Sequence, residues 1–370
     1  MTTNLRKSSD TPLVLAQDSQ LSNSSGRLIR YDFARAVAMS WVIAVHSLVV
    51  INTSTIGCAR YLTLAQAVFF SANSIFFMIS GHFNLTERNS TDIARFYLKK
   101  IRGIVLPVLI LFFLRTLYDL YPDFGSIGHV LKTYAKNTLG QYSSMEYWFI
   151  FQLISFLVVV PFLAPATEFL RHGHQRQRLF VGLGLVWFVL LFVTNNTGVI
   201  FSWSFLFTGF WFPFLIGPFV ESLFAEHRSS VLLLVATALC PLATLWLVVR
   251  GYSIGAFDNS PFYMLSSMGF YLVLLFIGNR IPMGGKLSKA ISFIARHSFT
   301  VYLVHMMVLL PLSRVLPVLE GGASIGMHWV LALFTFAISL IIAWLVDCVL
   351  IKPVQALFDI LVEKIAQRSS

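Results

Sequence analysis

The sequence contains few charged residues. Only 12% of its 370 residues are Asp, Glu, Lys or Arg, whereas 57% are hydrophobic and the mean hydropathy is +0.76. A soluble domain carries about 25% charged residues, so this composition excludes a soluble globular protein. Cysteine is also scarce: Cys58, Cys240 and Cys348 are scattered, odd in number and without metal-ligand spacing. We therefore expect no disulfide framework and no metal site.

Long hydrophobic stretches separated by short polar loops make up most of the chain. This pattern predicts an all-α, polytopic transmembrane helical bundle. No internal repeat is evident, which weakens an inverted-repeat transporter interpretation. Only residues 195–198 separate the fifth stretch from the sixth, and without that break the parity of the count changes. We count about ten spans: residues 30–51, 62–81, 101–121, 146–163, 179–195, 200–220, 230–249, 261–279, 298–316 and 328–351.

The net charge of +11 is distributed unevenly between the two sides of these spans. If the N-terminus is cytoplasmic, the inner segments hold 20 Lys and Arg residues and the outer loops hold five. By the positive-inside rule, this bias places both termini in the cytoplasm. The positive charge is thus a topology signal, and we expect no nucleic-acid partner.

Three regions follow from these patterns. Residues 1–28 are polar and rich in Ser, Thr, Asn and Gln, so we expect a disordered cytoplasmic tail. Their short apolar run is too brief for the core of a signal peptide. Residues 29–353 form the expected transmembrane domain, and residues 354–370 form the expected cytoplasmic C-terminal tail.

The first hydrophobic stretch carries three ionisable residues on one side. Arg35 and His46 are eleven residues apart, which is three helical turns plus about 20°, so they share a face. They lie about 16 Å apart along the axis, and Asp32 falls within about 60° of both. Ionisable groups inside a membrane are costly and usually face a polar cavity, so this face is the expected lining of a catalytic or conducting interior.

Five segments, in order along the chain, resemble motifs of the acyltransferase 3 family of integral membrane acyltransferases. In that family the first helix carries DxxRxxA followed by His, and the second helix ends in FFxxSG. A basic segment leads into the third helix, WFL begins the fourth, and SfxxYLxH lies on a late helix. Any one of these motifs is weak, but together and in order they are fairly specific. The matching segments are residues 31–46, 76–81, 96–107, 146–150 and 298–305.

The resemblance implies an acyltransferase domain in a multi-pass protein of the bacterial inner membrane, surrounded by membrane lipids. The implied activity is O-acetylation with cytoplasmic acetyl-CoA as the donor, succinyl and longer acyl-CoA donors being alternatives. The implied acceptor is a hydroxyl of a surface polysaccharide or exopolysaccharide, or of its lipid-linked oligosaccharide precursor. Other polysaccharide-assembly proteins are expected partners.

The chemistry of acyl transfer assigns roles to the residues of the first stretch. A base must take the hydroxyl proton, and a further group must stabilise the tetrahedral oxyanion. His46 is the candidate base because the ordinary histidine pKa of about 6.5 lies near working pH; alternatively it only bonds a neighbouring helix. Arg35 suits a CoA phosphate or the oxyanion, or it pairs with Asp32 or extends to the inner surface.

Two later stretches add further candidates for catalysis. Tyr302 and His305 share a helix face, and His305 could line the same cavity as His46 or bond within the core. Glu146 opens the fourth stretch on the expected outer side. It is either a partner of His46 or of acceptor hydroxyls, or a solvated carboxylate favoured by the helix dipole.

The remaining candidates concern binding. Ser80 could cap its helix or donate a hydrogen bond, and Gly81 beside it would allow close helix approach. Arg115 and Asp119 are four residues apart and are expected to neutralise each other. A basic run at the inner boundary either contacts donor phosphates or is an ordinary topology and lipid signal. Its members are Arg95, Lys99, Lys100 and Arg102. The candidate substrate-binding residues are Asp32, Trp148 and Tyr302.

Two other functions remain open from the residues alone. A transporter or flippase of a polar or lipid-linked substrate would use the intramembrane Asp, Arg and His as a path. A structural subunit of a polysaccharide-assembly complex would need no turnover. Binding and turnover of acetyl-CoA would separate the enzyme from both.

Overall fold

Every regular element in the described part of the chain is helical. The structure is a computed structural model that describes residues 28–51, 54–139, 145–197, 210–225, 235–251, 261–319 and 324–369. No strand occurs within these ranges, which confirms the all-α class. Seven helical segments there are long and apolar enough to cross a membrane. They are Ile29–Val50, Ile56–Asn84, Ile93–Leu120, Trp148–Arg171, Pro261–Gly278, Lys286–Val315 and Ile325–Gln367.

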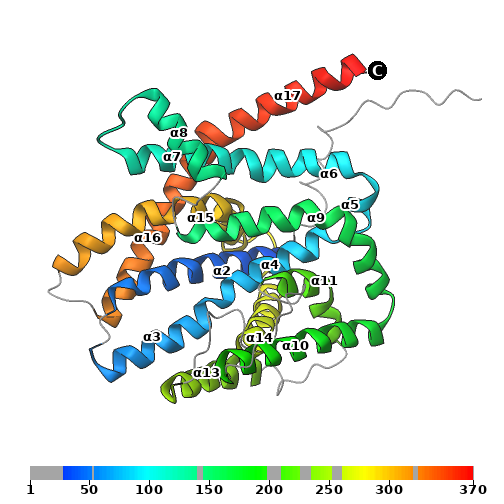
Figure 1. Ribbon diagram of the computed structural model, residues 1–370, viewed down its shortest axis with the longest axis vertical. Helices are drawn as coiled ribbons and strands as arrows, with labels where there is room; N and C mark the ends of the chain where they lie inside the picture. The colour runs from blue at the N-terminus through cyan, green and yellow to red at the C-terminus, as the bar shows by residue number, and fades with distance from the viewer. Residues whose placement is uncertain are drawn as a thin grey trace, which may run out of the picture.

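Figure 1 labels the helices along the chain. In chain order they are α2 (Ile29–Ser47), α3 (Ile56–Phe69), α4 (Ser71–Asn84), α5 (Arg88–Thr91), α6 (Ile93–Lys100), α7 (Leu106–Leu120), α8 (Ile127–Leu139), α9 (Trp148–Arg171), α10 (His174–Thr197), α11 (Trp211–Ala225), α13 (Cys240–Val249), α14 (Pro261–Gly278), α15 (Lys286–Leu319), α16 (Ile325–Val346) and α17 (Lys352–Ser369).

The helix bounds correct several details of the sequence prediction. The predicted span 62–81 consists of two helices, α3 and α4, which meet at Phe70. Helix α10 runs through Thr197, so the break expected at 195–198 does not begin before residue 198. The predicted outer loop after α7 contains helix α8. Residues 354–369 of the predicted C-terminal tail belong to helix α17, and their cytoplasmic location stays a prediction. The predicted N-terminal tail, up to residue 27, lies outside the described residues, and the count of ten spans stays a prediction.

Three helical segments contain a π-turn, and each π-turn ends two residues before a proline. The turns are Ile101–Val105, Val235–Leu239 and Asp347–Ile351, and the prolines are Pro107, Pro241 and Pro353. A proline within a helix lacks an N–H group, and its ring clashes with the carbonyl four residues earlier. In all three cases that carbonyl belongs to the π-turn, whose wider ring relieves the clash. The helices therefore continue past these prolines.

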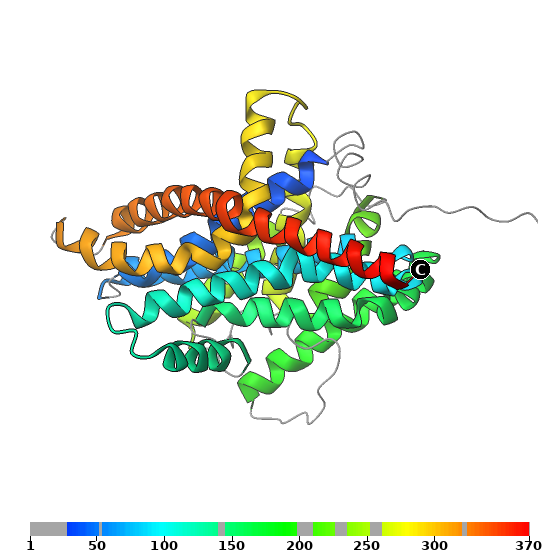
Figure 2. The ribbon, with the colours of Figure 1, turned by 90° about the horizontal axis from the view of Figure 1, so that it is seen from above.

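Helix α2 lies inside the bundle. It packs against α3, α4, α14, α15 and α16, and its Tyr31, Met39 and Ile43 side chains are fully buried. Figure 2 shows that the hairpin between α14 and α15 projects from the body, with the start of α2 beside it. Large apolar side chains stay exposed on outer helices, such as Phe162 on α9 and Leu333 on α16. Exposed apolar surface of this kind is what lipid tails cover. The predicted catalytic face is thus carried by a helix enclosed by five others.

Helices α4 and α11 touch through two glycines. A Cβ atom on Gly81 would lie 1.8 Å from the Phe214 carbonyl oxygen, and one on Gly217 would lie 2.1 Å from the Met78 carbonyl oxygen. Neither position can hold a larger residue without moving a backbone. The close approach that the sequence predicted for Gly81 is therefore confirmed.

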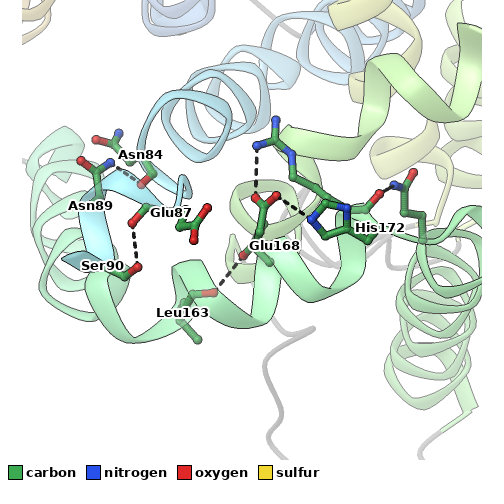
Figure 3. A network of polar contacts seen from close by, with 10 residues as sticks. Asn84, Glu87, Asn89, Ser90, Leu163, Glu168 and His172 are labelled. Atoms are coloured by element: carbon green, nitrogen blue, oxygen red, sulfur yellow. Dashed lines mark hydrogen bonds and ion pairs between the residues drawn. The ribbon is translucent and has the colours of Figure 1, made fainter.

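Helix α5 packs against α9, and Figure 3 shows the polar contacts on each side of this meeting point. The amide of Asn89 donates to the Asn84 carbonyl oxygen at 2.6 Å, and the Ser90 hydroxyl donates to the Glu87 carbonyl oxygen at 2.7 Å. On α9, the carboxylate of Glu168 lies 3.1 Å from Nε2 of its neighbour one turn later, His172. These contacts order each segment locally, and the packing of α5 on α9 joins two segments that the charge bias places on the same side of the membrane.

Candidate active site

His46 and His305 lie side by side in the interior. Their ring centroids are 5.2 Å apart and the rings are tilted by 44°. His46 is on the last turn of α2 and is partly exposed, whereas His305 on α15 is fully buried. The 259 residues that separate them in the sequence are bridged by the packing of α2 against α15. The structure thus places His305 beside His46, as the interpretation that both histidines line one cavity requires.

One nitrogen of His305 is held and the other has no partner. Its Nδ1 lies 2.6 Å from the Tyr302 carbonyl oxygen, which can only accept. Nδ1 therefore carries the proton of a neutral ring, and Nε2 holds a lone pair. Nε2 is buried and has no hydrogen-bond partner in the described part of the chain. A buried histidine with one nitrogen oriented by a carbonyl and the other nitrogen unoccupied has the form of a general base.

The start of α9 holds this part of α15 in place. The Tyr302 hydroxyl donates to the Glu146 carbonyl oxygen, and the Tyr147 hydroxyl donates to the Leu303 carbonyl oxygen at 3.0 Å. The Tyr302 ring also packs 5.5 Å from the His305 ring, so the predicted shared face is real. Two crossed hydrogen bonds between neighbouring segments fix the position of His305 along and around its helix.

Glu146 is buried, with 1% of its surface exposed. This result contradicts the interpretation of Glu146 as a solvated carboxylate at a helix start. Packing decided the outcome, because the short 3₁₀ turn Met145–Tyr147 directs the residue inward before α9 begins. Glu146 lies close enough to Arg115 and Tyr302 to interact with both electrostatically.

Arg115 and Asp119 form the expected pair on α7. The Arg115 Nε donates to both carboxylate oxygens, at 2.9 and 3.0 Å, which confirms that prediction. Arg115 is almost completely buried, and its Nη1 has no hydrogen-bond partner among the residues that the structure describes. Its charge also acts on His305. Arg115 therefore interacts both with Asp119, near the end of α7, and with His305 of the histidine pair.

A cluster of cations lies three turns of α2 away from His46. The Arg35 guanidinium sits 5.3 Å from the centroid of the Phe83 ring at the end of α4. Lys100, the last residue of α6, lies close enough to Arg35 and Lys99 for their charges to repel. Like charges gathered at one point favour a bound anion. Of the predicted donor-binding residues, the structure brings together Arg35, Lys99 and Lys100.

Tyr31 and His82 complete the wall of this cationic cluster. The Tyr31 hydroxyl lies 2.7 Å from His82 Nε2 and 3.2 Å from Arg30 Nη2. The Tyr31 ring packs 4.9 Å from the ring of Phe83, under Arg35. The sequence analysis did not single out either residue, although Tyr31 begins the first motif segment and His82 directly follows the second.

The structure places the other predicted binding residues away from this cluster or gives them other contacts. Arg102 makes an ion pair with Asp359 of α17 at 2.7 Å. Asp32 is buried and accepts a hydrogen bond from Ser292 of α15 at 2.9 Å. Trp148 stacks on Phe210, with ring centroids 4.9 Å apart.

Arg95 lies at the start of α6, and Ser80 lies near the end of α4. Arg95 is in the first turn of α6, where its backbone N–H is capped by Asp92 at 3.1 Å. Ser80 is half-buried near the end of α4, and its carbonyl oxygen accepts from the Asn84 amide at 2.7 Å. These contacts are local to each helix and do not test a role in donor binding.

Two pockets lie near opposite ends of α15. One, of about 350 Å³, lies at its start beside Ile29 of α2 and is lined by Lys289 and Arg296. The other, of about 590 Å³, lies near its end against α7 and is lined by Arg115 and Arg314. The histidine pair lies between them along the helix. Both volumes are adequate for small polar ligands.

Two further buried histidines, His297 and His328, make contacts that the sequence analysis did not predict. His297 bonds through Nδ1 to the carboxylate of Asp347, which also accepts from Thr300 at 2.6 Å. His328 lies 2.8 Å from both the Tyr61 hydroxyl and the Ala44 carbonyl oxygen. Asp347 and His328 are ionisable residues within the last predicted span, and that signal alone could have marked them.

Residues 28–348 match the family model described as an acyltransferase domain. The match spans all five motif segments, from the first helix to α16. No curated protein and no solved structure matches the chain.

Proposed function

The chain belongs to the acyltransferase 3 family and is a membrane acyltransferase, and we propose that it transfers an acetyl group from cytoplasmic acetyl-CoA to a sugar hydroxyl. The acceptor in this proposal is a surface polysaccharide or exopolysaccharide, or its lipid-linked precursor, at the inner membrane of a bacterium. The observation that carries the proposal is the buried pair of His46 and His305, with a lone pair on His305 Nε2.

The donor end of the site is the cationic cluster of Arg35, Lys99 and Lys100. CoA carries several phosphates, and guanidinium and ammonium groups bind phosphate through charge-assisted hydrogen bonds. Arg35 lies about 16 Å from His46 along α2. A single side chain does not span that distance, so Arg35 does not hold both the phosphates and the reacting carbonyl. We assign it to the phosphates. The extended pantetheine arm then directs the thioester toward the histidines.

The histidine pair is the base of the reaction. The acceptor oxygen attacks the thioester carbonyl carbon while its proton passes to a nitrogen of His46, the partly exposed member of the pair. When the carbonyl re-forms, the C–S bond breaks and its electron pair leaves on sulfur. The imidazolium returns its proton to the CoA thiolate, so the pair ends neutral. His305 Nε2 is a second place for the proton, and Glu146 and Tyr302 are positioning residues for His305.

Turnover of acetyl-CoA by the purified protein in nanodiscs tests this assignment. We expect His46→Asn and His305→Asn each to lower kcat by about 100-fold or more, because general-base catalysis contributes about 10²–10⁴-fold. In His305→Asn, the asparagine amide can still donate a hydrogen bond to the Tyr302 carbonyl oxygen, as Nδ1 of His305 does. It has no nitrogen in the place of Nε2 to accept a proton. The double variant should be no slower than the slower single variant, because residues that act as a unit are not additive.

Arg35→Ala should instead raise the KM for acetyl-CoA by about tenfold or more and change kcat little, because it removes a charge-assisted contact to phosphate. Lys364→Ala, which removes an exposed cation from α17, is the matched control. A wild-type protein that binds no acyl-CoA would disprove the proposal. Flux of a polar substrate without any acyl donor would establish the transporter alternative instead. Succinyl-CoA and longer acyl-CoA donors tested beside acetyl-CoA identify the acyl group.

A further inference from the structure

The larger pocket has the composition of a sugar site. It opens between the end of α7 and the last turns of α15 and measures about 590 Å³. Its walls combine the two cations Arg115 and Arg314 with the rings of Tyr118, Tyr121 and Phe124. Tyr118 and Tyr121 are 42% and 74% exposed, so their rings are available to a ligand. Aromatic rings present an apolar face and, in tyrosine, a polar tip, which suits a ring with both C–H and O–H groups.

The charge of this pocket is positive. Asp119 is its one carboxylate, and it is shared with the Nε of Arg115. Arg314 lies in the pocket wall and has no hydrogen-bond or ion-pair partner among the residues that the structure describes. Arg115 is 5% exposed, and its Nη1 is buried without a hydrogen-bond partner. Two guanidinium groups thus keep donor capacity for an anion, and their planar geometry matches a carboxylate.

The pocket lies next to the histidine pair. Leu310 of the pocket wall follows His305 by five residues on α15, a rise of about 7.5 Å. Arg115, on the opposite wall, is close enough to His305 to act on its charge. By the charge bias, the pocket is on the outer side, opposite the cationic cluster of Arg35, Lys99 and Lys100. A ligand held here would approach the histidines from the side opposite the donor.

We propose that this pocket binds the acceptor and that the acceptor is an acidic sugar, whose carboxylate is held by Arg314 and Arg115. This inference rests on the proposed acyltransferase function and specifies its substrate class. The aromatic rings hold the sugar face, and a hydroxyl of the same or the next sugar points to His46 and His305. The charge of the acceptor is then recognised directly beside the place of transfer.

Equilibrium binding of a uronic-acid oligosaccharide to the full-length protein in neutral-lipid nanodiscs tests the proposal without a donor. The probe is compared with the same oligosaccharide after its carboxyl groups have been reduced to alcohols. We expect the acidic form to bind about tenfold more tightly, since one charge-assisted contact is worth about that factor. Arg314→Gln should reduce this preference, because only Arg115 is left to hold the carboxylate, and should leave binding of the reduced form unchanged. Arg250→Gln, at an exposed arginine beyond α13, should preserve the preference.

Three results would overturn the proposal. They are equal binding of the acidic and reduced forms by the wild type, an Arg314→Gln variant that keeps the preference, and complete competition by phosphatidylglycerol, which would assign the pocket to a lipid headgroup. Wild-type turnover of acetyl-CoA is measured in parallel. Turnover without acidic-sugar binding disproves only this inference. Acidic-sugar binding without any turnover disproves the proposed function, and with it the acceptor role of the pocket, but leaves the pocket as an acidic-sugar site.

Discussion

At the scale of single residues, environment separates histidines that look alike in the sequence. His305 and His328 are both fully buried on apolar helices. His328 has both ring nitrogens occupied, because Ala44 accepts at Nε2 and the Tyr61 hydroxyl therefore donates to Nδ1. His305 has one nitrogen occupied and one without a partner. The first arrangement stabilises the fold, and the second leaves a reactive group in the interior.

We predict that His328→Ala lowers the free energy of unfolding by about 2–4 kcal/mol, because it deletes a buried ring and two hydrogen bonds. Tyr61→Phe removes one of the two bonds and should cost about 1 kcal/mol. Unfolding in mixed SDS micelles measures both values. Turnover per folded molecule should change little in either variant. A variant of normal stability without turnover would move His328 into the active site.

At the scale of elements, small residues and prolines set how the helices run. Three π-turns allow long apolar helices to pass prolines, and one of them holds Asp347 where it meets His297. Gly81 and Gly217 bring α4 against α11, so that the end of α4 lies beside the start of α2. That placement carries His82 and Phe83 to Tyr31 and Arg35. Helix packing therefore builds the donor end of the proposed site.

Gly81→Ala tests this packing. The added Cβ would lie 1.8 Å from the Phe214 carbonyl oxygen, so the helices must separate, and we expect a loss of about 2–4 kcal/mol of stability. Gly182→Ala on α10 is the control, because a Cβ there meets nothing within 4 Å. It should be neutral or stabilising by up to about 1 kcal/mol, since alanine favours a helix. Equal effects of the two substitutions in thermal unfolding would contradict the close contact.

At the scale of the whole molecule, contacts between distant segments agree with the predicted sidedness. The π-turn before α7 meets α17 through Arg102 and Asp359, and both residues were assigned to the cytoplasmic side. Val50 in the turn after α2, Leu309 in the second half of α15 and Met327 at the start of α16 pack together. Each contact joins two segments that the charge bias places on one side. The orientation itself stays a prediction, because packing alone does not say which side is cytoplasmic.

Thiol labelling in intact cells decides the orientation. In a background with the native cysteines replaced, Ser126→Cys lies in the exposed segment after α7, and Met283→Cys lies in the exposed turn before α15. A membrane-impermeant maleimide should label residue 126 directly and residue 283 only after permeabilisation, because positive charge is retained inside. The reverse pattern would place both termini outside.

The sequence by itself determined the class of the protein, its candidate first helix and its family. Hydrophobic length, charge bias and the shared face of Arg35 and His46 are local properties, which depend only on residue spacing and on the cost of placing charge in lipid. The tertiary structure alone decided which polar groups meet. It placed His305 beside His46, buried Glu146, and paired Arg102 with Asp359. These partners come from helices far apart in the sequence, and their contacts depend on packing that no local pattern records.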